Sequence, residues 1–405
     1  MIYSLIYSIF SRMGMLIITL LAVRLLNASE YGEFSYFINI INTFMLVGMA
    51  GCGVVTNILF ADNKLNHSQT LNEILGFNFS LVSVLTFGIW FIFMFFYIFV
   101  TGTFSLFSVG FFSLIILFSS NINNLIENVY IGQADFRQLA INSFVIMFAS
   151  VFFSSVCIYK FGILGAFFSF LFYRVFSLLI NFKRVNFDFK NILISLKSKE
   201  GITYFRKIGF PALLSSLMVA PVVSFLITVT LSKTSFTEIG YFNWIYQWYL
   251  LVIFIPSSLS GYFLQSLVKA ERSKFKIFNK MVGFALIFSL IAISIFLFLK
   301  EYVLLYAGEE YLIKANNLYI VMVISFTLYT LNSIFFSLWI SLSKAWIGVY
   351  LNILWAIVMV FVGISYSGEY GVDAIGYAFL SSYTILFLVQ YVLYFFYQQR
   401  YKLEF

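Results

Sequence analysis

The chain has 405 residues, of which 62% are hydrophobic and only 10% charged. Soluble globular domains contain about 45–50% apolar and about 25% charged residues, so this composition excludes that class. The formal net charge of +8 is not gathered into an aromatic–basic module of the kind that binds nucleic acid, so we expect no nucleic-acid partner. The sequence therefore predicts an all-α integral membrane protein.

Apolar runs of about twenty or more residues, divided at polar breaks, predict twelve transmembrane helices. In the first half of the chain they cover 3–26, 34–60, 73–100, 104–131, 138–159 and 162–182. In the second half they cover 208–231, 239–267, 277–299, 315–341, 345–366 and 372–398. A transmembrane β-barrel would instead show short segments in which apolar and polar residues alternate.

The basic residues indicate how the chain is oriented. Most of the 24 lysine and arginine residues fall in segments that share a side of the membrane with both termini. Cytoplasmic loops carry an excess of such residues, so we expect both termini in the cytoplasm. The positive charge then faces anionic lipid headgroups. We therefore expect membrane lipids among the partners.

The longest predicted segment outside the spans, 183–207, is basic and cytoplasmic. Its residues Ile192, Leu193 and Leu196 alternate with lysines and predict a short interfacial helix, although a solvated linker fits the pattern nearly as well. The predicted organisation is a six-helix lobe at 1–182, a linker at 183–207 and a second six-helix lobe at 208–405.

A polar phrase occurs twice, as EYGEF at Glu30–Phe34 and as EIGYF at Glu238–Phe242, 208 residues later. The pairs Phe161–Gly162 with Tyr370–Gly371, Asn142 with Asn352, and Gly165 with Gly376 follow in the same order at nearly the same spacing. Such a series predicts a duplicated six-helix unit. Since six is even, the two repeats are parallel, related by an axis along the membrane normal.

Each copy of the phrase falls where the outer turn between the first two helices of a repeat is predicted. The glycines suit a tight turn and the aromatic residues suit the headgroup level. Glu30 and Glu33 also suggest a metal-binding carboxylate pair, but Tyr241 replaces Glu33 in the second copy, which favours the turn. Together with a single histidine, this leaves no expected metal site. The residues assigned to the repeat turns are Glu30, Gly32, Glu238 and Gly240.

Several of these segments resemble one family. They are AVRLLNASEYGEFSYF (22–37), FGILGAFFSFLFYR (161–174), IGFPALLSS (208–216) and EIGYFNWIYQWYLLVIFIPSSLSGYFLQSL (238–267). They are similar to the polysaccharide-exporter branch of the multidrug/oligosaccharidyl-lipid/polysaccharide (MOP) superfamily, the O-antigen flippase type. The chain departs from that family at Asn27, where a glycine is typical.

The resemblance implies two lobes that form a V around a central cavity in the inner membrane of a bacterium. It implies a transporter, not an enzyme, that flips a polyprenyl-pyrophosphate-linked oligosaccharide from the inner to the outer leaflet by alternating access. Partners would be this lipid-linked glycan and other proteins of surface-polysaccharide assembly. The chain contains no ATP-binding G-x-x-x-x-G-K-[ST] loop, so we expect no cofactor, and the membrane potential or an ion would drive transport.

Two arginines lie within predicted spans, Arg12 in the first and Arg174 in the sixth. An arginine at mid-bilayer costs roughly 2.5–3.5 kcal/mol and is expected to face a cavity or a partner. The guanidinium fork suits pyrophosphate. The second half has no arginine at the corresponding positions, near Ala220 and Ile385, which favours cargo binding over a scaffold role. The alternatives are that Arg12 extends to the inner surface, or that either arginine pairs with a buried acid.

The predicted fourth span contains SSNINNLIENVYIGQ, in which Asn121, Asn124 and Asn128 share one helix face. Glu127 is the one acid near the interior of a predicted span. It carries a proton, pairs with an arginine or caps the helix end. Asn42 shares a face with Asn39 in the second span. Hydrogen bonding between helices is the alternative to substrate contact for these amides. We assign Asn42, Asn121, Asn124 and Glu127 to the cavity.

In the second half, YFNWIYQWYLL places Gln247 and Trp248 on an aromatic stripe. Aromatic faces stack on sugar rings, so these two residues are cavity candidates, while an aromatic belt at the membrane surface explains the pattern equally. Pro221 and Pro256 predict helix breaks, which suggest a hinge or the edge of a cavity.

Two other functions remain as alternatives. A membrane polysaccharide polymerase or glycosyltransferase would need a sizeable outer loop, and the longest predicted outer stretch, Lys300–Lys314, is short. A cation-coupled multidrug exporter of the same superfamily would need acids within its spans, where Glu127 is the one candidate.

Overall fold

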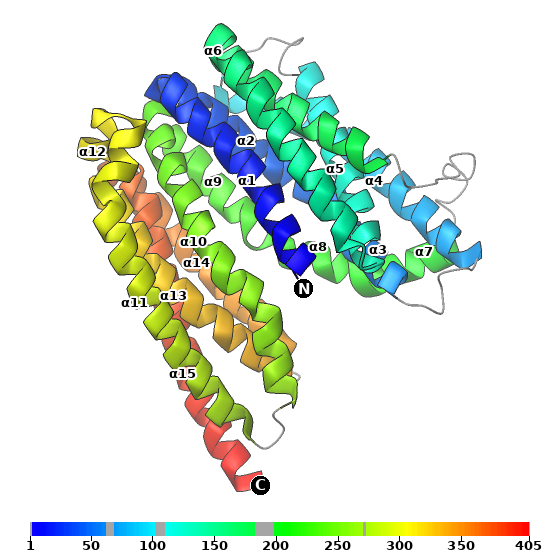
Figure 1. Ribbon diagram of the computed structural model, residues 1–405. Helices are drawn as coiled ribbons and strands as arrows, with labels where there is room; N and C mark the ends of the chain where they lie inside the picture. Colours follow the sequence, from blue (N-terminus) through cyan, green and yellow to red (C-terminus); the bar gives the residue numbers. More distant parts are fainter. Residues whose placement is uncertain are drawn as a thin grey trace. The chain divides into compact units, whose positions relative to one another are not determined.

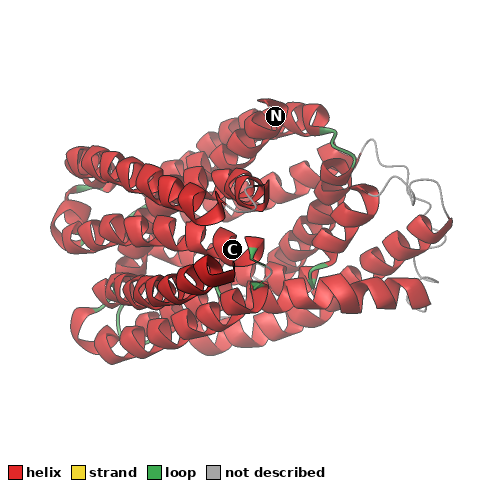
Figure 2. Ribbon diagram, turned by 90° about the horizontal axis from the view of Figure 1, so that it is seen from below, coloured by secondary structure: helices red, strands yellow, loops and turns green. Residues whose placement is uncertain are grey.

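The computed structural model describes residues 2–61, 69–101, 110–182, 198–269, 273–342 and 344–404. Within these ranges the chain is helical, joined by short turns, and contains no strand (Figures 1 and 2). The predicted all-α class is therefore confirmed for the described residues. The chain divides into two compact units, Met1–Ser224 and Phe225–Phe405.

The first unit is built around a long helix, α6, against which α1 packs along much of its length and α5 packs as well (Figure 1). α3 packs on α5, and α2 packs on α4 and α5. The elements are α1 (Ile2–Leu25), α2 (Ala28–Met49), α3 (Cys52–Ala61), α4 (Gln69–Thr101), α5 (Phe111–Gly132), α6 (Phe136–Phe182), α7 (Lys199–Tyr204), the π-helical turn η4 (Phe205–Gly209), α8 (Phe210–Leu217) and the first residues of α9 (Ala220–Leu231).

The second unit has α13 at its centre, in contact with α10, α11 and α15, and α14 packs along α15. Its elements after α9 are α10 (Phe236–Lys269), α11 (Lys274–Ala307), α12 (Glu309–Lys314), α13 (Asn316–Ser341), α14 (Ala345–Tyr370) and α15 (Asp373–Glu404).

The repeated phrase does not form turns, as the sequence suggested, but the first turns of helices α2 and α10. Asn27 caps α2: its side chain accepts the backbone N–H of Glu30 at 2.9 Å, and the Glu30 carboxylate accepts the N–H of Asn27 at 3.3 Å. This reciprocal capping box starts the helix before the phrase. Ser235 accepts the N–H of Glu238 at the start of α10. Gly32 and Gly240 are consequently buried helix residues.

Two glycines with nearly identical backbone angles lie 209 residues apart. Gly162, with φ 57° and ψ −132°, divides α6 at the point between two predicted spans. Gly371, with φ 54° and ψ −128°, follows the last residue of α14 and precedes α15. A positive φ of this kind is readily adopted by glycine and strained for other residues. The same residue type therefore reverses the chain in the same way in both halves.

A pair of hydrogen-bonded amides recurs at the same spacing. In the first unit the Asn181 side-chain N–H donates to the Asn123 Oδ1 at 2.9 Å. In the second unit the Gln390 side-chain N–H donates to the Asn332 Oδ1 at 2.6 Å. Both residues of the second pair lie 209 positions after those of the first. In each unit the bond joins the fourth and sixth predicted spans of its half.

Seven helices of the described chain are long and apolar enough to cross a membrane, and the bent pair of α2 and α3 would make an eighth. α6 alone accounts for two predicted spans, because the chain stays helical on both sides of Gly162. α5 is not among the seven, since its asparagines and Glu127 lower its hydropathy. Twelve spans remain the prediction from the sequence.

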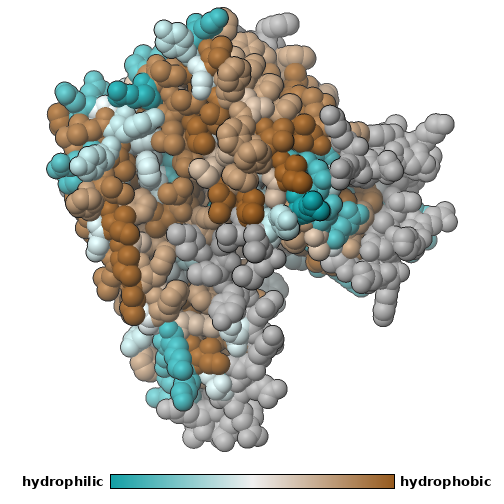
Figure 3. Space-filling view, viewed as in Figure 1, coloured by the Kyte–Doolittle hydropathy of each residue, from teal (hydrophilic) through white to brown (hydrophobic). Residues whose placement is uncertain are grey.

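Large apolar side chains cover much of the surface, as the face in Figure 3 shows. Phe152 is 75% exposed, Phe298 77% and Phe361 72%. A water-soluble protein rarely exposes extended apolar patches. With the apolar helices, this surface indicates a multi-pass membrane protein. The orientation of its termini remains a prediction.

The predicted linker and the predicted proline breaks can be compared with the structure. The division between the units falls inside α9, whereas the sequence places the linker at 183–207; residues 183–197 lie outside the described residues, and the three-part organisation stays a prediction. Pro221 lies in the first turn of α9, after a break at 218–219. The predicted interruption at Pro256 does not end the helix, because α10 continues through this residue, and the hinge role of both prolines stays a prediction. Proline removes one helical hydrogen bond there without ending the helix.

Candidate functional site

The helix pair α2 and α3 is broken by a bend of 55°. Ala50 (φ 47°) and Gly51 (φ 72°) both adopt left-handed backbone angles, and the Ala50 N–H donates to the Val47 carbonyl at 3.1 Å to close α2. A side chain at Gly51 would collide with the backbone carbonyl of Gly209. Both the angle and the contact therefore require glycine at this position.

A polar cavity of about 370 Å³ lies beside this break, within the first unit. Helices α2, α5 and α6 contribute its polar side chains, and the start of α3 contributes backbone. No acidic side chain lines it among the described residues. The polar side chains of the wall are Asn42, Ser120, Asn121, Asn124, Asn128 and Arg174.

Arg174 supplies the positive charge of the cavity. One of its terminal nitrogens, Nη2, donates to the Asn42 Oδ1 at 3.1 Å, and its guanidinium lies 5.0 Å from the ring centre of Phe170 and 5.6 Å from that of Tyr173. Its Nε is buried without a hydrogen-bond acceptor in the described part of the chain. No ion pair with a carboxylate is present there either. The guanidinium thus keeps donor capacity for a ligand.

The predicted asparagine face of α5 is turned to this cavity. Asn121 donates to the Thr86 Oγ1 at 2.8 Å, and Asn128 donates to the Asn124 Oδ1 at 2.8 Å. Ser120, for which the sequence gives no distinctive pattern, is only 7% exposed, and its hydroxyl has no partner among the described residues. The structure therefore brings Asn42, Asn121, Asn124 and Arg174 together.

Glu127 lies outside this wall, in a hydrogen-bonded network between α1, α5 and α6. Its carboxylate accepts the Tyr7 hydroxyl at 3.0 Å, the Asn123 amide at 2.9 Å and the Asn181 amide at 3.4 Å. Asn142 extends the network by donating to the Asn181 Oδ1 at 2.7 Å. Glu127 therefore joins helices and does not cap α5, which continues to Gly132.

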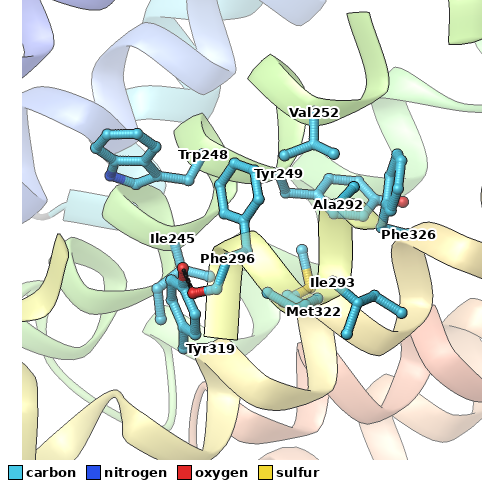
Figure 4. Close-up of a pocket in the computed structure, with 11 residues that line it drawn as sticks. Ile245, Trp248, Tyr249, Val252, Ala292, Ile293, Phe296, Tyr319, Met322 and Phe326 are labelled. Carbon is cyan, nitrogen blue, oxygen red and sulfur yellow. Dashed lines mark hydrogen bonds between the residues drawn. The ribbon is translucent and has the colours of Figure 1, made fainter. Parts of the chain in front are cut away.

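The remaining cavity candidates are not brought into this site. Arg12 has an exposed side chain on α1 and does not line the cavity. Gln247 and Trp248 belong to the second unit. There Trp248 borders a narrow gap between α10, α11 and α13 whose wall consists of aromatic and aliphatic side chains, among them Phe296 and Met322 (Figure 4). Gln247 is half-buried and outside that wall.

The sequence contains a local signal for the helix break between α2 and α3. The segment MAGCG at Met49–Gly53 places two glycines inside a predicted span, and glycine within a helical pattern marks a site of close approach or a helix end. The network around Glu127 had no such local signal, because Tyr7 is 120 residues distant from it.

No protein-family model and no curated protein sequence matches this chain. Solved structures do match it over almost its whole length. A multidrug resistance MATE family transporter of the MOP superfamily, in an inward-facing conformation, is similar with a TM-score of 0.77 at 14% identity, covering 99% of this chain and 98% of that one. The lipid II flippase MurJ, in an inward closed conformation, is similar with a TM-score of 0.75 at 15% identity, covering 96% and 87%.

A third similar structure is a MOP superfamily transporter from Pyrococcus furiosus, described as having a binding pocket of reverse polarity that suggests a different function. Its TM-score is 0.67 at 14% identity, and the match covers 99% of this chain and 96% of that one. At such identities the comparisons establish the fold. This chain has the fold that MATE transporters and MurJ share.

Proposed function

We propose that this protein is a flippase that moves a polyprenyl-pyrophosphate-linked oligosaccharide from the inner to the outer leaflet of a bacterial plasma membrane. The observation that carries the proposal is the polar cavity of the first unit. It presents a half-buried arginine, Arg174, that makes no ion pair among the described residues and interacts with the Glu127 carboxylate only at longer range, and five polar side chains besides. A cationic cavity inside an apolar helix bundle suits an anionic headgroup whose hydrocarbon tail stays in lipid.

The fold supports a transport role but does not distinguish between cargoes, so the choice of cargo depends on the chemistry of the cavity. MurJ is named as a lipid II flippase, and its structure is similar to this chain. MATE transporters are named for multidrug resistance and are equally similar. The chemistry of the cavity favours the lipid-linked anion, because an exporter of cationic drugs would gain little from a wall that holds an arginine and, among the described residues, no acid.

We propose further that the chain consists of two parallel six-helix repeats, 1–182 and 208–405, joined by a cytoplasmic linker at 183–207. The recurring glycine angles at Gly162 and Gly371 support this, as do the two amide pairs 209 residues apart. Both termini would then lie in the cytoplasm. The lobes would alternate between inward-open and outward-open states.

An inside-negative membrane potential favours outward movement of an anion by about 2.3 kcal/mol per charge per 100 mV. It would supply the driving force without a nucleotide. Flipping that proceeds at the same rate with and without a potential would remove this part of the proposal.

A second candidate function, cation-coupled export, is favoured by one observation. Glu127 is a carboxylate held between α1, α5 and α6 by Tyr7 and Asn123, within the helix bundle. Carboxylates in such positions carry protons or cations in transporters. In that case Glu127→Gln would abolish drug export driven by a cation gradient.

The test uses proteoliposomes that contain the purified protein and a fluorescent polyprenyl-pyrophosphate oligosaccharide. A membrane-impermeant enzyme or quencher measures how much of it reaches the opposite leaflet. We expect Arg174→Gln to slow flipping by at least about ten-fold, since a charge-assisted hydrogen bond contributes about 1.5–3 kcal/mol. Arg174→Lys should retain part of the activity, because lysine keeps the charge without the planar fork.

Arg137→Gln is the matched control. It removes the same charge from the same helix, at an exposed position near the start of α6 that does not line the cavity. We expect it to flip like the unaltered protein. Equal rates for Arg174→Gln and Arg137→Gln would exclude the cavity as the cargo site. In cells, lipid-linked repeats that reach the outer leaflet unpolymerised when the gene is deleted would point to the polymerase alternative.

A further inference from the structure

The break between α2 and α3 exposes the beginning of a helix to the polar cavity. Gly51 and Gly53 both line the cavity, and because glycine has no side chain, the wall at these points is backbone. α3 has ten residues, and the Gly51 carbonyl accepts the N–H groups of Val54 and Val55. The N–H groups of Cys52 and Gly53, at the first two helical positions, have no acceptor within the described residues.

Free N–H groups at a helix start form a binding place for anions. The first turn of a helix cannot satisfy its own donors, and the aligned peptide dipoles place roughly half a positive charge there. Backbone donors at helix starts hold phosphate groups in several unrelated folds.

Two further groups point to a ligand in the same cavity. The Ser120 hydroxyl is buried, with the residue only 7% exposed, lines the cavity and has no partner among the described residues. The buried Nε of Arg174 likewise has none. Unpaired buried polar atoms are rare in native proteins, and a ligand accounts for them. All are donors, as an anion requires.

We propose that the first turn of α3, the Ser120 hydroxyl and the Arg174 guanidinium form one anion subsite that holds a phosphate or pyrophosphate group. This rests on the proposed function in one respect, the assignment of that group to the lipid-linked cargo. An ordinary phospholipid headgroup offers the same chemistry as a second source.

The corresponding part of the second unit has no helix break and therefore no helix start. The residues that follow the repeated phrase there belong to α10, which is continuous from Phe236 to Lys269. The helix start is therefore present in the first unit, where Arg174 is also found.

The test measures binding of inorganic pyrophosphate by calorimetry to the full-length protein in nanodiscs of phosphatidylcholine. Val54, in the first turn of α3, is 46% exposed and lines the cavity. Val54→Asp places a carboxylate beside the free N–H groups, where it competes with the ligand and stabilises the helix start. We expect pyrophosphate to bind at least about ten-fold more weakly to Val54→Asp than to the neutral variant Val54→Asn.

Ile58→Asp is the positional control. Ile58 lies one turn further along α3, is 45% exposed and does not line the cavity. The same new charge is then about 6 Å further from the helix start than at Val54, and the loss of affinity should be clearly smaller. Ser120→Ala should weaken binding by about three-fold, since it removes one neutral donor. Thermal midpoints of all variants show whether they remain folded.

The outcomes separate the subsite from the cargo. No pyrophosphate binding by the unaltered protein, or equal affinities for Val54→Asp and Val54→Asn, would overturn the subsite. Binding that follows the expected order, without flipping of the lipid-linked oligosaccharide, would keep the subsite and refute the cargo. The same binding measurement is then repeated in nanodiscs that contain phosphatidylglycerol, and again with the polyprenyl-linked sugar added. Loss of pyrophosphate binding with phosphatidylglycerol, and not with the polyprenyl-linked sugar, would assign the subsite to phospholipid.

Discussion

Removing the carboxylate of Glu127 should destabilise the first unit in a way that depends on the replacement. In Glu127→Leu the Tyr7 hydroxyl and the Asn123 amide lose their acceptor, at 3.0 and 2.9 Å. Asn181 loses its longer hydrogen bond to Glu127, at 3.4 Å, but keeps an acceptor, because it also donates to the Asn123 Oδ1 at 2.9 Å. Two donors are thus left unpaired in an apolar bundle.

The magnitude follows from these two donors. A buried polar group without a partner costs about 1–3 kcal/mol, while hydrogen bonds between membrane helices average about 0.6 kcal/mol when measured directly. We therefore expect Glu127→Leu to lower the free energy of unfolding by about 1–4 kcal/mol, and the thermal midpoint by about 3–10 °C. Glu127→Gln keeps an acceptor oxygen and should cost less than about 1 kcal/mol.

The assay is the thermal midpoint of the purified protein in nanodiscs. Ser169→Ala is a suitable control, because its buried hydroxyl donates only to the Gly165 carbonyl of its own helix, at 2.6 Å. We expect it to stay within about 1 kcal/mol of the unaltered protein. A Glu127→Leu midpoint equal to that of Ser169→Ala would show that the network does not hold α1 to α5.

Two further predictions concern the features that recur in both halves. Gly162→Ala and Gly371→Ala should each cost about 1–3 kcal/mol in unfolding free energy, since alanine is strained at φ 57° and φ 54°; midpoints unchanged from the unaltered protein would argue against strain at these positions. Gln390→Leu should cost about 1–3 kcal/mol, because Asn332 loses a donor and the Trp339 indole N–H loses its acceptor at 3.0 Å; a cost below that of Ser169→Ala would show that this amide pair is not structural.

Long apolar runs made most helices predictable. The predicted spans 3–26, 73–100 and 315–341 match α1, α4 and α13 within a few residues. Hydropathy alone suffices there, since a polar break ends each run. Hydropathy did not reveal the helix break at Ala50–Gly51, because the residues on both sides of it are equally apolar. The break depends on the packing of Gly209 against Gly51, a contact between segments far apart in the chain.

Site residues were predictable where they follow a pattern within one helix, and were missed where their partners are distant in the sequence. Asn121, Asn124 and Asn128 share a helix face, so periodicity alone placed them together, and they line one cavity. Asn181 was missed, because a single asparagine near a span end gives no periodicity and its partner Asn123 is 58 residues away.

The contacts of Gly165 and Gly376 do not support their pairing as equivalent positions of the two repeats. A side chain added at Gly165 would meet Cys157, whereas one added at Gly376 would meet Leu318.

The two halves share a scaffold but not the polar chemistry built on it. At the spacing of 209 residues that joins Asn123 to Asn332, the counterpart of Glu127 is Phe336 and that of Arg174 is Tyr383. Phe336 lies so close to Gly348 that a side chain at that glycine would collide with its ring. The second unit therefore has aromatic rings at the positions where the first unit holds a carboxylate and a guanidinium: Tyr383 is buried, whereas Phe336 is 42% exposed. Because Arg174 lines the polar cavity and has no arginine counterpart in the second unit, a role in the shared scaffold does not account for it, which favours the proposed contact with the cargo. Glu127, outside the cavity wall, joins helices of the first unit by hydrogen bonds.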